Sequence, residues 1–261
     1  MCGLENILSF EQVGLIYQAE NGEVEALKDI SFSVQAGELL SVVGPSGGGK
    51  TTILSLIAGL EHPTSGRVVI AGQEVSGISS KTGYMLQKDN LLDWRTIRKN
   101  VLLGLEIRGM LTAEHVDYAD NLLKVYGLWE FRDGYPRQLS GGMRQRAALI
   151  RTLATKPDIL LLDEAFSALD YQTRLVVADD VFNILKREKK TAVIVTHDIS
   201  EGISMADRIL MITKRPGRVK LDMHLTFAGA DAPISPLKRR DAPEFRGYFN
   251  QVWKELDIHA P

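Results

Sequence analysis

The chain has 261 residues, of which 44% are hydrophobic and 25% are charged, the proportions of an ordinary globular protein. Its formal net charge of −2 gives no electrostatic reason to expect nucleic acid as a partner. The only cysteine, Cys2, rules out an internal disulfide and fits a reducing compartment. The sequence shows no signal peptide and no apolar run of the ~18–20 residues that a membrane helix needs. We therefore expect a cytoplasmic protein that reaches a membrane only by docking on a partner.

The pattern of apolar residues predicts the core. Residues 7–18 and 30–38 alternate apolar and polar side chains, which predicts two antiparallel strands. Later runs are short and almost fully apolar, as strands buried on both faces of a parallel sheet are: residues 38–44, 158–164, 191–198 and 208–213. Residues 50–60 and 175–190 between them have helical periodicity. The fold class predicted is α/β, a P-loop NTPase three-layer core with an N-terminal antiparallel β subdomain.

Two further segments complete the predicted domain organisation. Residues from about 90 to 150 have helical periodicity without a strand signal, which indicates an inserted α-helical subdomain within a domain spanning 1–220. Residues 221–261 form a C-terminal extension that ends in an amphipathic helix, with one apolar face. We expect this face to pack on the chain's own core, and contact with a partner chain is the alternative. The face carries Phe245, Phe249, Val252, Trp253 and Leu256.

The stretch after the first buried strand, GPSGGGKT, fits the phosphate-loop pattern G-x-x-x-x-G-K-[ST]. A strand precedes it and a helix follows, which is the context in which backbone N–H groups surround phosphate oxygens. We expect Lys50 to span the β- and γ-phosphates of a bound nucleotide and the Thr51 hydroxyl to bind Mg²⁺. The predicted binding residues of this loop are Gly44, Pro45, Ser46, Gly47, Gly48, Gly49, Lys50, Thr51 and Thr52.

Polar residues end two of the buried strands. Asp163 and Glu164 follow one strand, and His197 follows the next. Ligands of open α/β sheets bind at the carboxyl ends of the strands, so all three should face the phosphate loop. We predict that Asp163 joins the Mg²⁺ shell and that Glu164 polarises an attacking water. His197 is predicted to position the γ-phosphate or the water, although a lone histidine is often structural.

In this order the motifs resemble those of the nucleotide-binding subunit of ATP-binding cassette (ABC) transporters, over roughly residues 7–220. The resemblance rests also on Gln87 in YMLQKDN, on LSGGMRQR and on SALD. It implies that Gln87 senses Mg²⁺ and the γ-phosphate, which makes it both a catalytic and a metal-site candidate. It implies that Asp170 belongs to a loop crossing between subunits. Tyr17 is similar to the aromatic residue that stacks on adenine, and an ordinary half-buried strand tyrosine is the alternative.

The LSGGM stretch forms a second predicted anion site at a helix start, but it has no lysine. The resemblance implies that it serves the ATP of another chain in a two-fold homodimer, where Ser140, Gly141 and Gly142 face the partner's Lys50. The alternative is a local helix cap. The signature more often reads LSGGQ, and here Met143 takes the last position. We expect no loss of function from this change, because the serine and glycines carry the phosphate contacts.

Several stretches are similar to the nitrate, sulfonate and taurine uptake group: LLDWRTIRKNV, DEAFSALDYQTR, TKRPGRV and RRDAPEFRGYFNQVWKEL. The resemblance implies an importer ATPase at the cytoplasmic face of the cell membrane, bound to a multi-span permease and serving a solute-binding protein indirectly. ATP and Mg²⁺ are the implied cofactors. The alternatives are a cytosolic ABC ATPase not coupled to transport and a phosphoryl-transferring enzyme. Trp94 is predicted to help grip a permease helix, or else to pack inside the helical subdomain.

Overall fold

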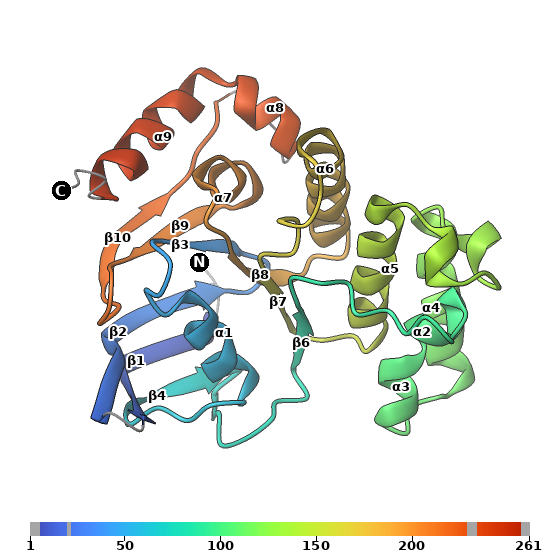
Figure 1. Ribbon diagram of the computed structural model, residues 1–261, viewed down its shortest axis with the longest axis horizontal. Helices are drawn as coiled ribbons and strands as arrows, with labels where there is room; N and C mark the ends of the chain where they lie inside the picture. The colour runs from blue at the N-terminus through green and yellow to red at the C-terminus, as the bar shows by residue number, and fades with distance from the viewer. Residues whose placement is uncertain (1–5, 20–21, 229–233, 257–261) are drawn as a thin grey trace, which may run out of the picture.

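The computed structural model describes residues 6–19, 22–228 and 234–256, so Cys2 lies outside the described residues (Figure 1). The N-terminal sheet is antiparallel and has the strand order β2-β1-β4-β5. The strand predicted over residues 7–18 is β1, whereas the strand predicted over 30–38 is the second part of β2, which begins eight residues earlier and ends at Gln35. The strands are β1 (Asn6–Ala19), β2 (Gly22–Gln35), β4 (Ser65–Ile70) and β5 (Gln73–Glu74).

The larger sheet has the strand order β10-β9-β3-β8-β7-β6, and all its pairs are parallel except β10 with β9. Four of its strands are the predicted apolar runs, whereas β6 and β10 are additional. The strands are β3 (Leu39–Val43), β6 (Thr82–Met85), β7 (Ile159–Asp163), β8 (Thr191–Val195), β9 (Arg208–Ile212) and β10 (Val219–His224).

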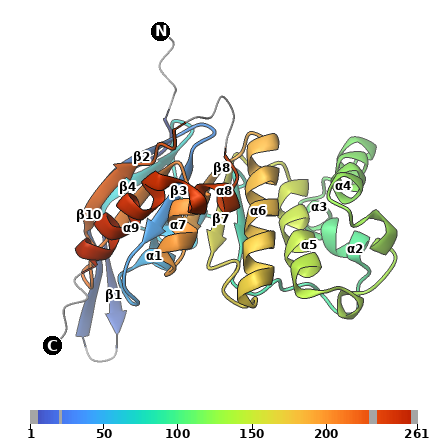
Figure 2. The ribbon, with the colours of Figure 1, turned by 90° about the horizontal axis from the view of Figure 1, so that it is seen from above.

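Both faces of this sheet are buried, and successive side chains of a strand point to opposite faces. On β7, Ile159 and Leu161 pack with helix α1 (Lys50–Ala58) and the N-terminal sheet, whereas Leu160 and Leu162 pack against the helices on the other face. The helix α6 (Tyr171–Arg187) belongs to that second group. Seen from above, α6 and α5 lie beyond β7 and β8, on the side away from the N-terminal strands (Figure 2).

The inserted α-helical subdomain predicted over about 90–150 is present. Helix α5 packs on α2, α3, α4 and α6, and thereby joins the insertion to the core. Thr96 and Thr112 begin α2 and α4, where each side chain accepts a hydrogen bond from the backbone N–H three residues on. The helices are α2 (Ile97–Val101), α3 (Leu103–Ile107), α4 (Ala113–Val125) and α5 (Gly141–Ala154), with single turns at η1 (Trp129–Phe131) and η2 (Pro136–Gln138).

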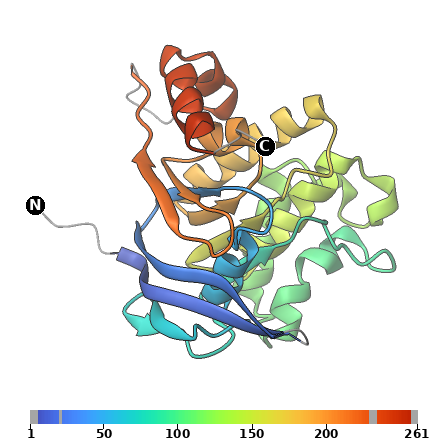
Figure 3. The same cartoon turned by 60° about the vertical axis from the view of Figure 1, so that its left-hand side comes forward.

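The C-terminal helices pack on the core. Helices α8 (Pro236–Asp241) and α9 (Pro243–Glu255) both contact α7 (Ile199–Met205) (Figure 3). The apolar face of α9 packs on the chain's own core, as expected, except that Trp253 is 49% exposed and stacks on Phe249. Strand β10 runs across the predicted domain boundary at residue 220, and that division stays a prediction.

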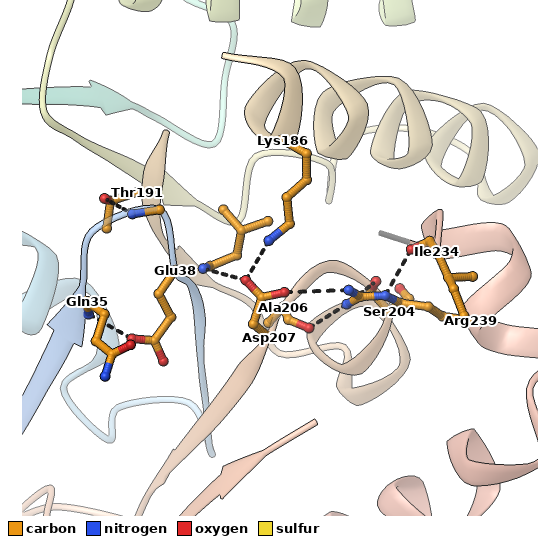
Figure 4. Close-up of polar contacts among 11 residues, drawn as sticks. Gln35, Glu38, Lys186, Thr191, Ser204, Ala206, Asp207, Ile234 and Arg239 are labelled. Atoms are coloured by element: carbon orange, nitrogen blue, oxygen red, sulfur yellow. Dashed lines mark hydrogen bonds and ion pairs between the residues drawn. The ribbon is translucent and has the colours of Figure 1, made fainter. Parts of the chain in front are cut away.

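A buried arginine anchors the extension (Figure 4). The Arg239 side chain is 6% exposed, and its guanidinium donates to the carbonyls of Ser204 and Ala206 at the end of α7. It also lies 3.5 Å from Asp207, whose other carboxylate oxygen accepts from Lys186 of α6 at 2.6 Å. The extension is therefore tied to α6 and α7. No helix within the described ranges combines the length and apolar character needed to cross a membrane.

Candidate functional site

The phosphate loop joins β3 to α1. Gly49 precedes the helix with a φ of 93°, and a Cβ built on it would lie 2.5 Å from a Leu27 methyl, so only glycine fits. The Lys50 side chain is 7% exposed, and its Nζ donates to the carbonyls of Gly44 at 2.9 Å and Pro45 at 3.0 Å. Burial lowers the pKa of Lys50. The loop thus holds a desolvated ammonium group inside its own curve.

A hollow of about 280 Å³ lies over this loop. Its lining includes the apolar side chains of Tyr17, Val24 and Ala26 as well as the loop backbone and the lysine. The Tyr17 hydroxyl donates to Thr52 Oγ1 at 3.5 Å, which ties the ring to the start of α1. Apolar side chains that suit a flat ring and a cationic loop that suits phosphates together fit a nucleotide. The lining residues are Tyr17, Val24, Ala26, Ser46, Gly47, Gly49, Lys50, Thr51, Thr52, Glu164 and Arg215.

Asp163 ends β7 beside the loop. Its carboxylate accepts hydrogen bonds from Thr51 Oγ1 at 3.4 Å and from the Tyr84 hydroxyl at 3.1 Å. Burial raises the pKa of Asp163. A carboxylate and a hydroxyl that meet next to a phosphate loop are the oxygen ligands that Mg²⁺ prefers, so this pair fits the ion. Tyr84 comes from β6, which the sequence pattern does not predict, and so it is absent from the predicted site.

Glu164 follows directly with a left-handed backbone, φ 46°, which is costly for a residue with a side chain. Its N–H donates to Val195 O of β8 at 2.8 Å, and its carbonyl accepts from Ser167 Oγ at 2.9 Å. These bonds hold the strained residue in place. Its Oε1 lies 3.1 Å from His197 Nδ1 at the end of β8, so the structure brings together the predicted base and the predicted histidine.

Gln87 lies farther along the same edge. Its Nε2 donates to Ser167 Oγ at 3.0 Å, and Ser167 in turn donates to the carbonyl of Glu164. Gln87 does not line the hollow. One intervening side chain therefore connects Gln87 to the backbone of the strained glutamate, and the predicted contact of Gln87 with the metal stays a prediction.

The LSGGM stretch lies away from the hollow. Ser140 caps α5 by accepting from Met143 N at 3.3 Å, so the stretch is a helix cap in this chain. A Cβ on Gly142 would lie 2.8 Å from a Val177 methyl, so close packing on α6 is a second reason for this glycine. Asp170 caps α6 by accepting from Thr173 N at 3.0 Å. None of the residues Ser140, Gly141, Gly142 and Asp170 lines the hollow.

Trp94 is 76% exposed, so the alternative in which it packs inside the helical subdomain is wrong. A fully buried side chain, Asn100 of α2, holds the loop that carries it. Asn100 Oδ1 accepts from Leu92 N at 2.7 Å, and its Nδ2 donates to three carbonyls, those of Leu92, Arg95 and Thr96. The backbone on either side of Trp94 is therefore fixed, and the loop presents a large apolar ring to the surface.

A buried lysine in a strand–loop–helix phosphate loop, with carboxylates at the end of the adjoining strand, defines a P-loop nucleoside triphosphatase. The family model described as ABC transporter matches residues 27–167. The chain belongs to the ABC transporter family and is one of its ATP-binding, ATP-hydrolysing subunits.

The chain is similar to the uncharacterized ABC transporter ATP-binding protein YtlC of Bacillus subtilis, 46% identical over 97% of this chain and 96% of that protein. It is 37% identical to the taurine import ATP-binding protein TauB of Roseobacter denitrificans over 94% of both, and 37% identical to the nitrate import ATP-binding protein NrtD of Synechocystis over 94% of this chain and 93% of that protein.

Among solved structures, the chain is similar to the ATP-binding cassette MJ0796 in a dimeric post-hydrolysis state bound to ADP and Pi. The TM-score is 0.70 at 32% identity, over 84% of this chain and 99% of that one. The predicted fold class is confirmed by this likeness, including the antiparallel N-terminal sheet and the mainly parallel second sheet.

Proposed function

We propose that this chain is the ATPase subunit of an importer for a small solute, with an anion such as nitrate, a sulfonate or taurine as its cargo. The names of its relatives TauB and NrtD support this cargo class. The chain acts as a homodimer on a multi-span permease at the cytoplasmic face of the cell membrane, and the permease receives solute from a solute-binding protein. The cassette itself does not touch the solute, so the relatives and not the site carry the cargo assignment.

ATP lies in the hollow, with adenine on Tyr17 and the phosphates against the loop N–H groups, Lys50 and Thr52. Thr51 and Asp163 would hold Mg²⁺, joined by Gln87 when the site closes. Bound there, the ion supplies charge neutralisation on the phosphate oxygens. The burial of Lys50 supports this placement, because a desolvated ammonium group gains most from an anionic ligand.

Glu164 accepts the proton of the water whose oxygen attacks the γ-phosphorus, while the bond from that phosphorus to the oxygen of ADP breaks. The 3.1 Å contact lets His197 fix the rotamer of this carboxylate and reach toward the γ-phosphate. The strained backbone of Glu164 supports its catalytic role, because such conformations cluster at active sites.

Each ATP is completed by the second chain. Ser140, Gly141 and Gly142 lie at the start of α5, a helix of 14 residues, and outside the hollow of their own chain. In a two-fold dimer they reach the γ-phosphate of the partner's site and contribute N–H donors and the helix dipole. Asp170 lies in the loop that crosses between the chains. ATP then stabilises the dimer, and hydrolysis releases it.

The rigid, exposed Trp94 is the observation that carries the coupling to a membrane partner. Aromatic anchors in fixed positions dominate many protein interfaces, and a loop with four hydrogen bonds to one buried asparagine loses little entropy on docking. We assign the docking site of a permease cytoplasmic helix to this loop. Gln87 precedes this loop by a few residues, and the hydrogen bonds from Gln87 to Ser167 and from Ser167 to Glu164 lead from there to the hydrolysis site.

Trp94→Ala tests the coupling. Truncating a buried anchor typically costs about 2 kcal/mol of binding, so co-purification with the permease and solute uptake should fall sharply. The ATPase rate and melting temperature of the free subunit should not change, because the ring makes no core contact. Trp253→Ala, an exposed tryptophan on α9, is the matched control and should assemble normally. A Trp94→Ala subunit that assembles and supports uptake like the control would overturn this docking site.

A further inference from the structure

The turn between β9 and β10, residues 213–218, packs directly on the phosphate loop. A Cβ on Gly217 would lie 2.2 Å from the carbonyl oxygen of Gly48, and a Cβ on Gly48 would lie 2.6 Å from the carbonyl oxygen of Thr213. Neither contact leaves room for a side chain. The turn is therefore a wall of the phosphate loop, although it is far from the loop in the sequence.

Hydrogen bonds fix the conformation of this turn. Thr213 Oγ1 lies 2.9 Å from the carbonyl of Lys214 and 3.0 Å from that of Pro216, and it accepts from Arg218 N at 3.0 Å. The Gly217 N–H donates to Ala26 O at 2.9 Å, and the Gly217 carbonyl accepts from Lys28 N at 2.9 Å. The turn is tied in this way to β2, which forms the apolar wall of the hollow.

Arg215 lies in this fixed turn and lines the hollow together with Ser46 and Gly47. Its Nη2 lies 3.8 Å from the position of a Cβ on Gly47. Within the described part of the chain, no hydrogen bond or ion pair involves its guanidinium, whereas the buried Arg239 is fully engaged. A permanent positive charge thus lies over the phosphate loop, and no carboxylate among the described residues forms an ion pair with it.

We propose that Arg215 binds the phosphate chain of the nucleotide, as a second cationic group beside Lys50. The inference rests on the proposed placement of ATP in the hollow. The guanidinium fork matches phosphate oxygens and stays charged at every working pH. Because Arg215 is exposed at the rim, its attraction is screened by salt, whereas that of the buried Lys50 is screened much less.

The test is nucleotide affinity of the full chain by titration calorimetry. Arg215→Gln should weaken ATP and ADP binding about tenfold, the loss of one charge-assisted hydrogen bond, and Arg215→Lys should restore part of it. The difference in ATP affinity between Arg215→Gln and the unmodified protein should shrink in 1 M salt, because charges are then screened over about 3 Å. Arg218→Gln, an exposed arginine of the same turn that does not line the hollow, is the matched control and should bind like the unmodified protein.

Equal affinities for Arg215→Gln and the control would overturn the inference. A loss of affinity that persists unchanged in high salt would also overturn it, since that result indicates packing or base stacking in place of charge. Lys50→Ala distinguishes a failure of the Arg215 contact from a failure of the proposed placement of ATP in the hollow. If Lys50→Ala loses ATP binding while Arg215→Gln keeps it, only the role of Arg215 fails. If Lys50→Ala binds ATP normally, the placement of ATP in the hollow fails as well.

Discussion

Glu164 combines a strained backbone with a carboxylate that faces both the hollow and His197. One hydrogen bond to β8 and two from Ser167 hold this backbone conformation, and none uses the Glu164 side chain, so a side chain of the same shape should leave it intact. Glu164→Gln should therefore bind ATP normally and lose about 10²–10⁴-fold in hydrolysis, because an amide cannot accept the proton. Phosphate release and nucleotide titration on the same sample check this. Hydrolysis near the unmodified rate would show that another group is the base.

The residues at the strand ends could be predicted from the sequence, and their neighbours could not. Asp163, Glu164 and His197 follow long apolar runs, and parallel strands bring such positions to one edge. Tyr84 belongs to a four-residue strand with no clear period, so its bond to Asp163 depends on the pairing of β6 with β7. Arg215 reaches the hollow only because the turn after β9 packs on the phosphate loop, a contact that no local pattern encodes.

Among the strands and helices, too, some could be predicted from the sequence and others could not. The strands β7 and β8 are buried on both faces and read as unbroken apolar runs, which a sequence pattern detects. Strand β10 is the antiparallel edge of the sheet and half exposed, and its sequence, VKLDMH, alternates apolar and polar residues over only six positions, so it was not predicted as a strand. Its pairing with β9 is what places it. The apolar face of α9 was predictable from its period, but the 49% exposure of Trp253 on that face was not.

The C-terminal helices depend on the anchor shown in Figure 4. Arg239→Met keeps an unbranched side chain but removes the guanidinium, which lies over the Phe182 ring and donates to the carbonyls of Ser204 and Ala206 and to Asp207. Removing one side of a buried charged network should lower the free energy of unfolding by about 3 kcal/mol. Urea denaturation of the full chain measures this. Lys238→Met, an exposed change on the same helix, is the control, and equal stability of the two variants would show that the anchor contributes nothing.

In the proposed function, each ATP site of the molecule is built from two chains. The hollow holds Lys50, and the LSGGM helix start lies outside it in the same chain. In a head-to-tail dimer, the two halves of one site therefore come from different chains. The relative MJ0796 has a dimeric structure bound to ADP and Pi, which is consistent with such an arrangement.

The most direct measurement is the nucleotide trapped by a mixed dimer, built from one Lys50→Ala chain and one Ser140→Arg chain, each also carrying Glu164→Gln to prevent turnover. If each site is built from two chains, both defects fall in one site and the other site stays intact. The mixed dimer should then trap about half the ATP that the Glu164→Gln dimer traps. A dimer of two Lys50→Ala chains, or of two Ser140→Arg chains, has no intact site and should trap no ATP. If each LSGGM stretch served the Lys50 of its own chain, both sites of the mixed dimer would be damaged. A folded mixed dimer that traps no ATP would therefore contradict the two-chain site.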